Sequence, residues 1–492
     1  MDIEQIDDLA TAKVVMRAQQ STVQSQAKRI AELVEEIARL KGQPVPEQLA
    51  LELADLQEQL DNANKRLFGD SSEKRAKEES PAEKKPQTGH GPTEQHALVE
   101  VESFHELDED KRRCPCCNEE LQAIPGVFEE SIHITVVPAK YLRMKQRRQK
   151  YRCENECTIV TATNTPKARA GGRYSVDFAV HVAAGKYLDH LPLERQSRMM
   201  KRAGLVVTSQ TLWDQVEAIA EHLQPTYEAL RDYVLDADVV GVDETHWRLL
   251  TKKGKGQKST KKWWAWGVTR EDACWYRIHE SRSAQAAAEV LEGFEGTALV
   301  DGYKAYETLA NREGTDLALA NCWAHVRRKF VEAEEHYPEP CGVAIKLIGE
   351  LFAIEQEVTD DSLRASARKE RSEPIVDQLF KWARRQRGLP KGGLRKAIDY
   401  MLKLESGLRA FLDDPRIKLD NNGTERALRG LVIGRKNHYG SKSRRGTEVA
   451  AVFYSLLETA KLCGVNPEKY LIAAVKRAME EPGAVLLPQD YA

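Results

Sequence analysis

Three acidic residues, widely separated along the chain, are the positions where the sequence could place metal-dependent chemistry. Asp243 ends the apolar run 239–242 and Asp301 ends the apolar run 298–300, so each aspartate closes a predicted buried strand. Glu425 falls in the first turns of a helix that is predicted to follow a turn rich in Asp, Asn and Gly. Two apolar strands that each deliver an aspartate at the same kind of edge would set Asp243 and Asp301 side by side.

Clustered carboxylates need a compensating cation, because buried negative charges repel one another and lose their hydration. A pair or trio of them offers hard oxygen ligands to Mg²⁺, which keeps several waters and takes further ligands from substrate phosphates. Aspartates are common at strand ends in α/β proteins, and a carboxylate among cations is also compatible with a surface ion-pair network. The basic residues that crowd around Glu425 in the sequence are Arg426, Arg429, Arg435, Lys436, Arg444 and Arg445.

Four cysteines predict a structural zinc site. Cys114 and Cys117 make one knuckle, and Cys153 and Cys157 make a second. Four thiolates bind Zn²⁺ tetrahedrally, and a small β unit without its own core gains its fold from such a metal. Four unmetallated core cysteines are the alternative. Apolar alternation between the knuckles predicts a short β meander (Ile132, Ile134 and Val136).

A one-sided basic run lies between the two knuckles, with Tyr141 and Tyr151 interleaved. On a zinc ribbon such a run is typical of phosphate contact, although a solvated strand face would also account for part of it. The residues are Lys140, Arg143, Lys145, Arg147, Arg148, Lys150 and Arg152.

The remaining elements around the acids follow from pattern. Strands are predicted over 263–269, 274–280 and 317–321, and helices over 284–291 and from Cys322 through 330. Upstream, helices over 193–200 and 209–219 flank a turn at Ala203-Gly204, with Thr208 or Ser209 as the N-cap. This pair is compatible with a DNA-binding helix-turn-helix that places 210–215 near DNA, and equally with an ordinary helical bundle.

The N-terminal part is predicted to be helical over 5–68, with an apolar stripe at coiled-coil spacing. That stripe favours self-association, and an antiparallel hairpin within one chain is the alternative. Residues 69–97 have almost no large apolar side chains and predict a disordered linker. The stripe residues are Ile30, Leu33, Ile37, Leu40, Leu49, Leu53, Leu56, Leu60, Ala63 and Leu67.

Composition excludes several classes of protein. The 492 residues include 41% hydrophobic and 30% charged residues, and no uncharged apolar run approaches the roughly 18–20 residues that span a bilayer. The formal net charge of −2 excludes a uniformly basic coat but not local basic stripes. With nine cysteines and no signal-peptide pattern at the start of the sequence, we expect reduced thiols and a cytoplasmic protein.

Seven sequence words, in order, resemble the IS66 family of bacterial transposases. The resemblance covers most of the chain and includes the position of the zinc ribbon. The words are RLFGDSSEK (66–74), KYLDHLPLERQ (186–196), VDET around Asp243, LVDGYKAY around Asp301, CWAHVRRKF (322–330), DNNGTERALRGLVIGRKNHYGS (420–441) and LLETAKLCGVNPEKYL (456–471).

The resemblance implies a DDE transposase with a ribonuclease H-like core, in which Asp243, Asp301 and Glu425 are the catalytic acids. They would hold two Mg²⁺ (or Mn²⁺) ions per active site, roughly 3.5–4 Å apart. Cys322 and His325 resemble the Cys-x-x-His word of other insertion-bearing DDE transposases, which implies a place near the active site. The alternative is Cys322 and Trp323 in the core with a hydrogen-bonded His325. The chain departs from the family at 245–247 and 437–438, which affects substrate detail rather than the acids.

These observations predict a multidomain α+β chain. We expect DNA contact from the basic groups named above and from Arg327 and Arg328, which could instead face solvent. The predicted segments are 1–68 (helical, for dimerisation or DNA binding), 69–97 (linker), 98–170 (zinc ribbon), 171–236 (helix-turn-helix-like), 237–337 (first part of the core), 338–415 (helical insertion), 416–454 (second part of the core, with Glu425) and 455–492 (helical C-terminus).

The implied function is Mg²⁺-dependent cleavage and strand transfer at the ends of an insertion sequence. Its partners would be terminal inverted repeats and target DNA, with a homodimer joining the two ends, possible element-encoded accessory proteins and no membrane. Two other readings are a zinc-ribbon DNA-binding regulator and a ribonuclease H-like structure-specific nuclease without transposition activity.

Overall fold

The computed structural model describes the chain except for residues 1–24, 27, 42–44, 46, 69–98, 100, 103, 109–110, 125, 127, 132–133, 135, 137–139, 153–156, 170, 251–259, 359, 387–391 and 492. Contacts divide it into two compact units, one formed by 1–69 and 141–492 and the other by 70–140. The predicted linker, 69–97, lies wholly outside the described residues. None of the helices among the described residues is both long and apolar enough to cross a bilayer.

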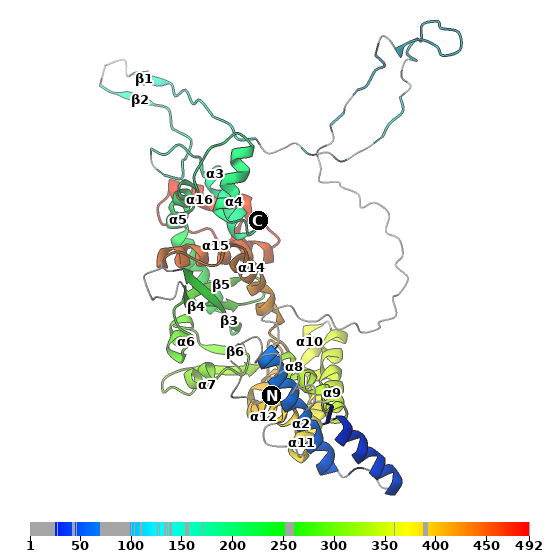
Figure 1. Cartoon of the computed structure of the whole chain (residues 1–492). Coiled ribbons are helices and arrows are strands. Elements are labelled where there is room, and N and C mark those ends of the chain that lie inside the picture. Colours follow the sequence, from blue (N-terminus) through cyan, green and yellow to red (C-terminus); the bar gives the residue numbers. More distant parts are fainter. Residues whose placement is uncertain are drawn as a thin grey trace, which may run out of the picture. The chain divides into compact units, whose positions relative to one another are not determined.

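One five-stranded mixed sheet forms the centre of the larger unit (Figure 1). Its strands are β3 (Val239–Leu250), β4 (Thr260–Thr269), β5 (Cys274–His279), β6 (Gly296–Val300) and β7 (Leu317–Asn321), in the order β5-β4-β3-β6-β7. The pairs β3–β4 and β4–β5 are antiparallel, and β3–β6 and β6–β7 are parallel. All five predicted strands are therefore present.

β3 corrects one sequence-based expectation. The apolar run before Asp243 predicted a strand that ends on this acid, yet β3 continues to Leu250. It continues because β4 pairs with it as far as Leu250–Thr260, while the ladder with β6 is recorded only from Val239 to Gly241. Asp243 thus lies within β3, just beyond that ladder, and not at the strand's end.

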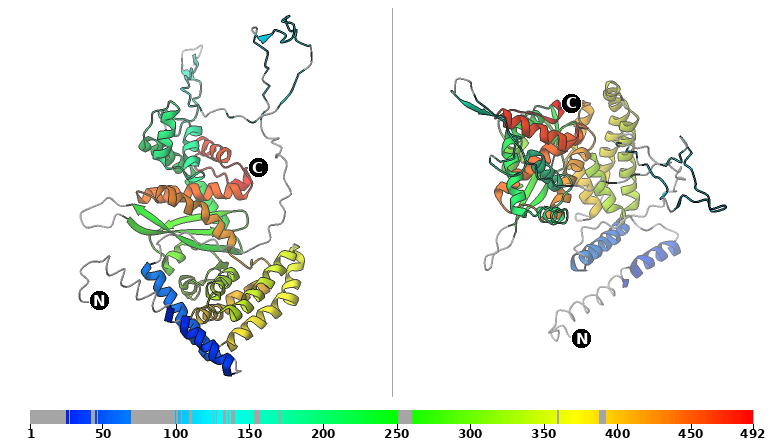
Figure 2. Two further views of the ribbon diagram at one scale, coloured as in Figure 1. Left: turned by 45° about the vertical axis from the view of Figure 1, so that its right-hand side comes forward. Right: turned by 90° about the horizontal axis from the view of Figure 1, so that it is seen from above.

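Helices cover both faces and one edge of this sheet (Figures 1 and 2). Leu428 of α14 (Asn422–His438) packs by Gly267 of β4, and Tyr306 of α7 (Lys304–Ala310) meets Trp266 on the other face. Along the β5 edge, Thr459 of α15 (Arg444–Leu462) bonds to the backbone of Cys274 in both directions. The edge strand is thereby protected from pairing with another chain.

The predicted helix pair is present and shares this core. α4 (Leu193–Arg202) and α5 (Ser209–Leu235) flank a turn in which Gly204 has φ +88°, and Thr208 caps α5 by accepting from the N–H of Thr211. Side chains from 171–236 and 455–492 belong to the same hydrophobic cluster as the sheet. The other helices there are α3 (Val176–Tyr187), α6 (Ala284–Val290), α16 (Pro467–Glu480) and a 3-10 turn, Pro488–Asp490.

A second apolar core lies in the predicted helical insertion. α8 (Trp323–Glu334), which follows β7, contributes to this core. Its Trp323 is fully buried and donates from Nε1 to the carbonyl of Leu408 at 2.9 Å. Its elements are α9 (Pro338–Glu357), α10 (Asp361–Ala367), a π-helical turn (Arg368–Ser372), α11 (Glu373–Arg385), α12 (Gly393–Lys403) and α13 (Glu405–Asp413).

The N-terminal helix α2 (Glu47–Phe68) packs against this insertion (Figure 2). Glu58 accepts a hydrogen bond from the N–H of Gly393 at 2.5 Å, and Asp61 lies 3.8 Å from His336. The helix over 25–26 and 28–41 leaves the first part of the apolar stripe exposed, with exposed fractions of 53% for Ile30 and 76% for Leu40.

The two strands of the predicted zinc-ribbon region are short. β1 (Lys150–Arg152) and β2 (Ile159–Thr161) pair antiparallel. Ile134 and Val136 are exposed and lie outside any strand, while Ile132 lies outside the described residues. The meander predicted from their alternation is therefore not formed at Ile134 and Val136.

Candidate active site

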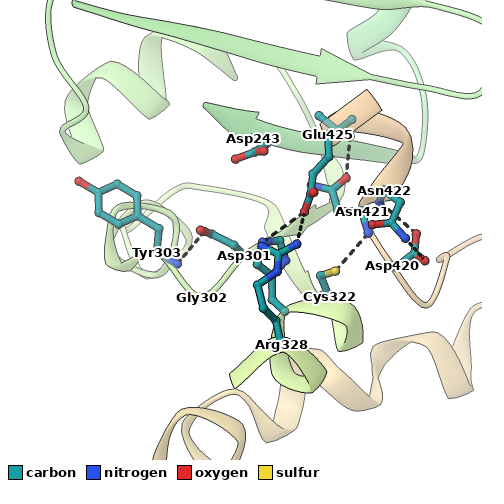
Figure 3. Close-up of polar contacts among 12 residues, drawn as sticks. Asp243, Asp301, Gly302, Tyr303, Cys322, Arg328, Asp420, Asn421, Asn422 and Glu425 are labelled. Carbon is teal, nitrogen blue, oxygen red and sulfur yellow. Dashed lines mark hydrogen bonds and ion pairs between the residues drawn. The ribbon is translucent and has the colours of Figure 1, made fainter. Parts of the chain in front are cut away.

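Asp243 and Asp301 are brought together by the pairing of β3 with β6. Gly241 stands opposite Leu299 in this parallel ladder, and each aspartate follows two residues later. Asp243 Oδ1 accepts from the N–H of Glu244 at 2.8 Å. Asp301 Oδ1 accepts from the N–H of Tyr303 at 2.9 Å, a bond drawn in Figure 3. Backbone donors therefore orient both carboxylates.

Glu425 reaches the same region because the start of α14 is bonded to β3. Asn421 donates from Nδ2 to the carbonyl of Val242 at 2.9 Å, and its Oδ1 accepts from Thr424 Oγ1 at 2.6 Å. Thr424 in turn lies 2.6 Å from Thr269 of β4. This buried polar network admits α14 only because residue 241 is glycine, since a Cβ there would overlap Thr424 Oγ1 and Asn421 Oδ1.

The Glu425 carboxylate faces α8. Its Oε1 lies 3.4 Å from Arg328 Nη2 and 3.4 Å from His325 Nε2. Burial and the neighbouring Arg328 lower the pKa of His325, while Glu425 and Asp301 act in the opposite sense. Figure 3 shows the Arg328 side chain extending from α8 toward Glu425.

Neither aspartate has an ion-pair partner in the described part of the chain, although Arg282 and protonated His325 attract Asp301 from farther away. Burial, followed by the charge of Glu244, raises the pKa of Asp243 to about 7, and Asp301 and Glu425 add to the rise. Within the described ranges no Lys, Arg or His side chain pairs with either aspartate. As the side chains stand, no three Asp, Glu, His or Cys residues of the described part converge closely enough to hold one metal ion.

Glu244 is an acid that the sequence reasoning left without a role. Successive side chains of a strand point to opposite faces, so Glu244 lies across the sheet from Asp243. Its buried side chain is paired with Arg282 and accepts from the hydroxyl of Tyr306. Arg282 also stacks 3.7 Å over the ring of Tyr303. The sequence did hold a signal for this difference: adjacent residues of a strand point to opposite faces, so the neighbouring acids of VDET cannot share one site.

Cys322 is part of the core beside this site. Its side chain is 2% exposed and its Sγ accepts from the N–H of Asn421 at 3.2 Å. Burial raises the pKa of the thiol to about 11, so the sulfur stays protonated at neutral pH. His325 turns its Nε2 to Glu425 instead.

A known protein family matches the part of the chain that contains the three acids. The model of the family described as "Transposase IS66 family" matches residues 171–449, more than half of the chain and a span that includes all three acids. The chain belongs to the IS66 transposase family. The resemblance stated from the seven sequence words is thereby confirmed.

This IS66-family chain is similar to two uncharacterized proteins of Sinorhizobium fredii (strain NBRC 101917 / NGR234). It is 33% identical to y4jD over 396 residues, covering 75% of each chain. It is 32% identical to y4qI over 368 residues, covering 71% of this chain and 68% of the relative. The structure titled "Mos1 transposase paired-end complex with left transposon end" matches at 12% identity and a TM-score of 0.14, over 52% of this chain and 82% of that one. A TM-score of this size is no evidence of a shared fold.

The predicted DNA-contacting residues of this family member differ in accessibility. Arg435 is only 7% exposed and donates to Thr245 and to the carbonyl of His246, so its guanidinium is occupied by β3. Arg445 pairs with Glu217 and Glu448. Those with exposed side chains are Lys140, Arg143, Lys145, Arg147, Arg148, Arg327, Arg429, Lys436 and Arg444.

The predicted zinc ligands fall in both compact units. In the smaller unit, backbone N–H groups of Cys116 and Cys117 lower the pKa of Cys114, which favours a metal-binding thiolate. Cys157 is exposed in the larger unit, and Cys153 lies outside the described residues. None of the described cysteines forms a disulfide.

Proposed function

We propose that this IS66-family protein is a DDE transposase whose catalytic acids are Asp243, Asp301 and Glu425. The observation that carries the proposal is the approach of three carboxylates from β3, the end of β6 and the start of α14. Besides burial and Glu244, the charges of Asp301 and Glu425 raise the pKa of Asp243. Neither aspartate has an ion-pair partner in the described part of the chain.

The topology supports a ribonuclease H-like core. β3 is central, antiparallel to β4 on one side and parallel to β6 on the other. The helices α9 to α13 lie between β7 and α14 in the chain, which fits an insertion between the second and third acids.

The donor set fits Mg²⁺ or Mn²⁺. Carboxylate oxygens are the ligands that these hard cations take, and a cation would relieve the repulsion recorded at Asp243. Asp243, Asp301 and Glu425 would hold two such ions. When bound, the metals would neutralise phosphate charge and activate an attacking water or 3′-hydroxyl.

The chain's own groups position the DNA strand. Arg328, beside Glu425, is placed to hold a phosphate oxygen, and exposed Arg327 follows on the same helix. Hydrolysis followed by transesterification needs no covalent enzyme intermediate, and the protonated thiol of Cys322 offers no nucleophile.

Other parts of the proposed function rest on separate features. The Cys114–Cys117 knuckle, with Cys153 and Cys157, would hold one structural Zn²⁺. The exposed apolar stripe of 25–41 fits a homodimer that joins the two element ends, rather than a hairpin within one chain. Terminal inverted repeats and target DNA are the proposed partners, with element-encoded accessory proteins, in the cytoplasm.

The test uses DNA that borders the reading frame and carries the inverted repeats. Wild type should nick this DNA with Mg²⁺ or Mn²⁺, and Asp243→Ala should bind it without nicking. Binding without nicking by wild type, with any accessory proteins present, would instead favour the zinc-ribbon regulator. Cleavage of branched DNA without strand transfer would favour the structure-specific nuclease.

A further inference from the structure

One face of α14 carries an exposed row that begins beside Glu425. With 3.6 residues per turn, positions 425, 429, 433 and 436 fall on one side of the helix. Arg429 and Lys436 are exposed, and Ile433 between them is 48% exposed. Arg426, next to this row, is exposed too.

The charges nearest Glu425 on this row are not neutralised. Within the described part of the chain, no carboxylate pairs with Arg426 or Arg429. The opposite side of α14 is buried through Ala427, Leu428 and Leu431. At Arg426 and Arg429 the helix therefore presents positive charge without a carboxylate partner, close to the acids.

Tyr439 ends this row in an unusual conformation. It is the C-cap of α14, with φ 64° and ψ 4°, and its side chain is 62% exposed. The left-handed region at a helix end normally holds glycine or asparagine, because a Cβ is disfavoured there. No ring contact or hydrogen bond engages the Tyr439 side chain among the described residues.

The backbone beneath Tyr439 is fixed to the sheet. Ser441 donates to the carbonyl of Arg248 at 3.0 Å and accepts from the N–H of Leu250 at 2.8 Å. Gly440, between Tyr439 and Ser441 in the chain, has φ +110°, and a Cβ there would overlap the carbonyl of Arg248. The exposed ring is thus attached to an anchored backbone, so little backbone freedom is left to lose when it contacts a ligand.

We propose that the exposed face of α14 is a track for one DNA strand and that Tyr439 stacks on an unpaired base of it. Arg426 and Arg429 bind the intervening phosphates. This inference rests on the proposed function for the nature of the polymer, and it adds a base-binding residue outside the catalytic acids.

The geometry sets the spacing. Fourteen residues of helix separate Glu425 from Tyr439, which is about 21 Å at roughly 1.5 Å per residue. A strand with the rise of duplex DNA, about 3.4 Å per nucleotide, covers this distance in roughly six nucleotides. A base inside a duplex has both faces covered, so a base that stacks on Tyr439 must be single-stranded or flipped out.

The experiment measures stacking by the fluorescence of 2-aminopurine in a single-stranded oligonucleotide, with full-length protein and Ca²⁺ in place of Mg²⁺. Wild type and Tyr439→Phe should quench the fluorophore. Tyr439→Gly should not, and its affinity should fall about 5- to 100-fold. Because glycine suits the left-handed conformation, Tyr439→Gly should keep or raise the melting temperature, which separates lost stacking from lost folding.

Two further arms complete the test. Arg429→Gln should reduce the salt dependence of binding by about one charge, whereas Arg385→Gln, an exposed arginine of α11, should not. On a duplex of the bordering DNA, a single 2-aminopurine should respond most strongly about six nucleotides from the mapped cleavage point. Unchanged quenching by Tyr439→Gly, or equal loss in Tyr439→Phe, would overturn the inference. If wild type quenches 2-aminopurine but never cleaves the bordering DNA, the transposase proposal is overturned and the stacking by Tyr439 stands.

Discussion

Asp243 and Asp301 occupy equivalent places on two adjacent parallel strands, each two residues beyond the Gly241–Leu299 pair. This relationship puts two carboxylates without cation partners on one stretch of the sheet, where the bonded start of α14 adds Glu425. Such an arrangement costs stability, because ionised carboxylates in a partly buried cluster repel one another. It is therefore the place where function and stability should oppose each other.

Replacing Asp243 by asparagine should stabilise the metal-free protein and remove its activity. The neutral amide relieves a carboxylate whose pKa burial and neighbouring acids raise to about 7, so the gain at pH 8 should be on the order of 1–3 kcal/mol. DNA cleavage should fall by more than roughly 100-fold. Urea unfolding and a nicking assay measure the two effects. Asp238→Asn, at an exposed carboxylate before β3, should change neither, and a destabilised Asp243→Asn would contradict the repulsion.

Gly241→Ala should displace the start of α14. The added methyl would overlap Thr424 Oγ1 and Asn421 Oδ1, so we expect a loss of roughly 1–3 kcal/mol and a fall in cleavage greater than the fall in DNA affinity. The control is Gly349→Ala in α9, where an added Cβ meets nothing within 4 Å and should stabilise by about 0.5–1 kcal/mol. Cleavage at the wild-type rate by Gly241→Ala would show that Glu425 does not depend on this contact.

Arg368 should be a main stabilising residue of the insertion. Its buried guanidinium binds Glu355 through two 2.8 Å bonds and donates to the carbonyls of Phe411, Asp414 and Ile417. Arg368→Met leaves a half-buried carboxylate and three carbonyls without this partner and should cost about 3–5 kcal/mol.

Adding Glu355→Leu to Arg368→Met should recover part of that loss, because it removes a carboxylate that would keep only the longer 3.9 Å contact with Arg364. Denaturant unfolding of the two single variants and the double variant measures the coupling. Strict additivity of the three values would mean that the pair is not coupled.

His438 should make stability depend on pH. Burial lowers its pKa to about 3, with Lys186 and His190 adding to the effect, while Nε2 lies 3.2 Å from the hydroxyl of Tyr454. Because the folded pKa lies below the unfolded value of about 6.5, acid favours the unfolded chain. Stability present above pH 6.5 is therefore lost as the pH falls, by about 2 kcal/mol between pH 7 and pH 5.

The measurement compares the free energy of unfolding of wild type and His438→Gln across this pH range. The amide can retain a hydrogen bond to Tyr454 but does not titrate, so the variant should lack this part of the slope. Parallel pH profiles for the two proteins would mean that His438 is not the group responsible.

Local patterns in the sequence predicted most of the elements. Apolar runs located the five strands, and Thr208 was a correct N-cap, because both depend on side-chain periodicity and on hydrogen bonds to near neighbours. Helices were predicted over 338–415 for the same reason, and the structure has helices there from Pro338 to Asp413. The exception was Ile134 and Val136, whose alternation did not produce a strand, since alternation forms a strand only where one face has a surface to pack on.

The chain's own sequence determined which residue types could do chemistry and that the protein resembles the IS66 family. The tertiary structure alone decided their surroundings: Asp243 lies inside a long strand, Glu244 pairs with Arg282 across the sheet, and Arg435 is buried against β3. These outcomes depend on contacts between residues far apart in the chain. A carboxylate or guanidinium contacts its partner only when strand register and helix docking are fixed. The spacing of residues along the sequence does not predict such contacts.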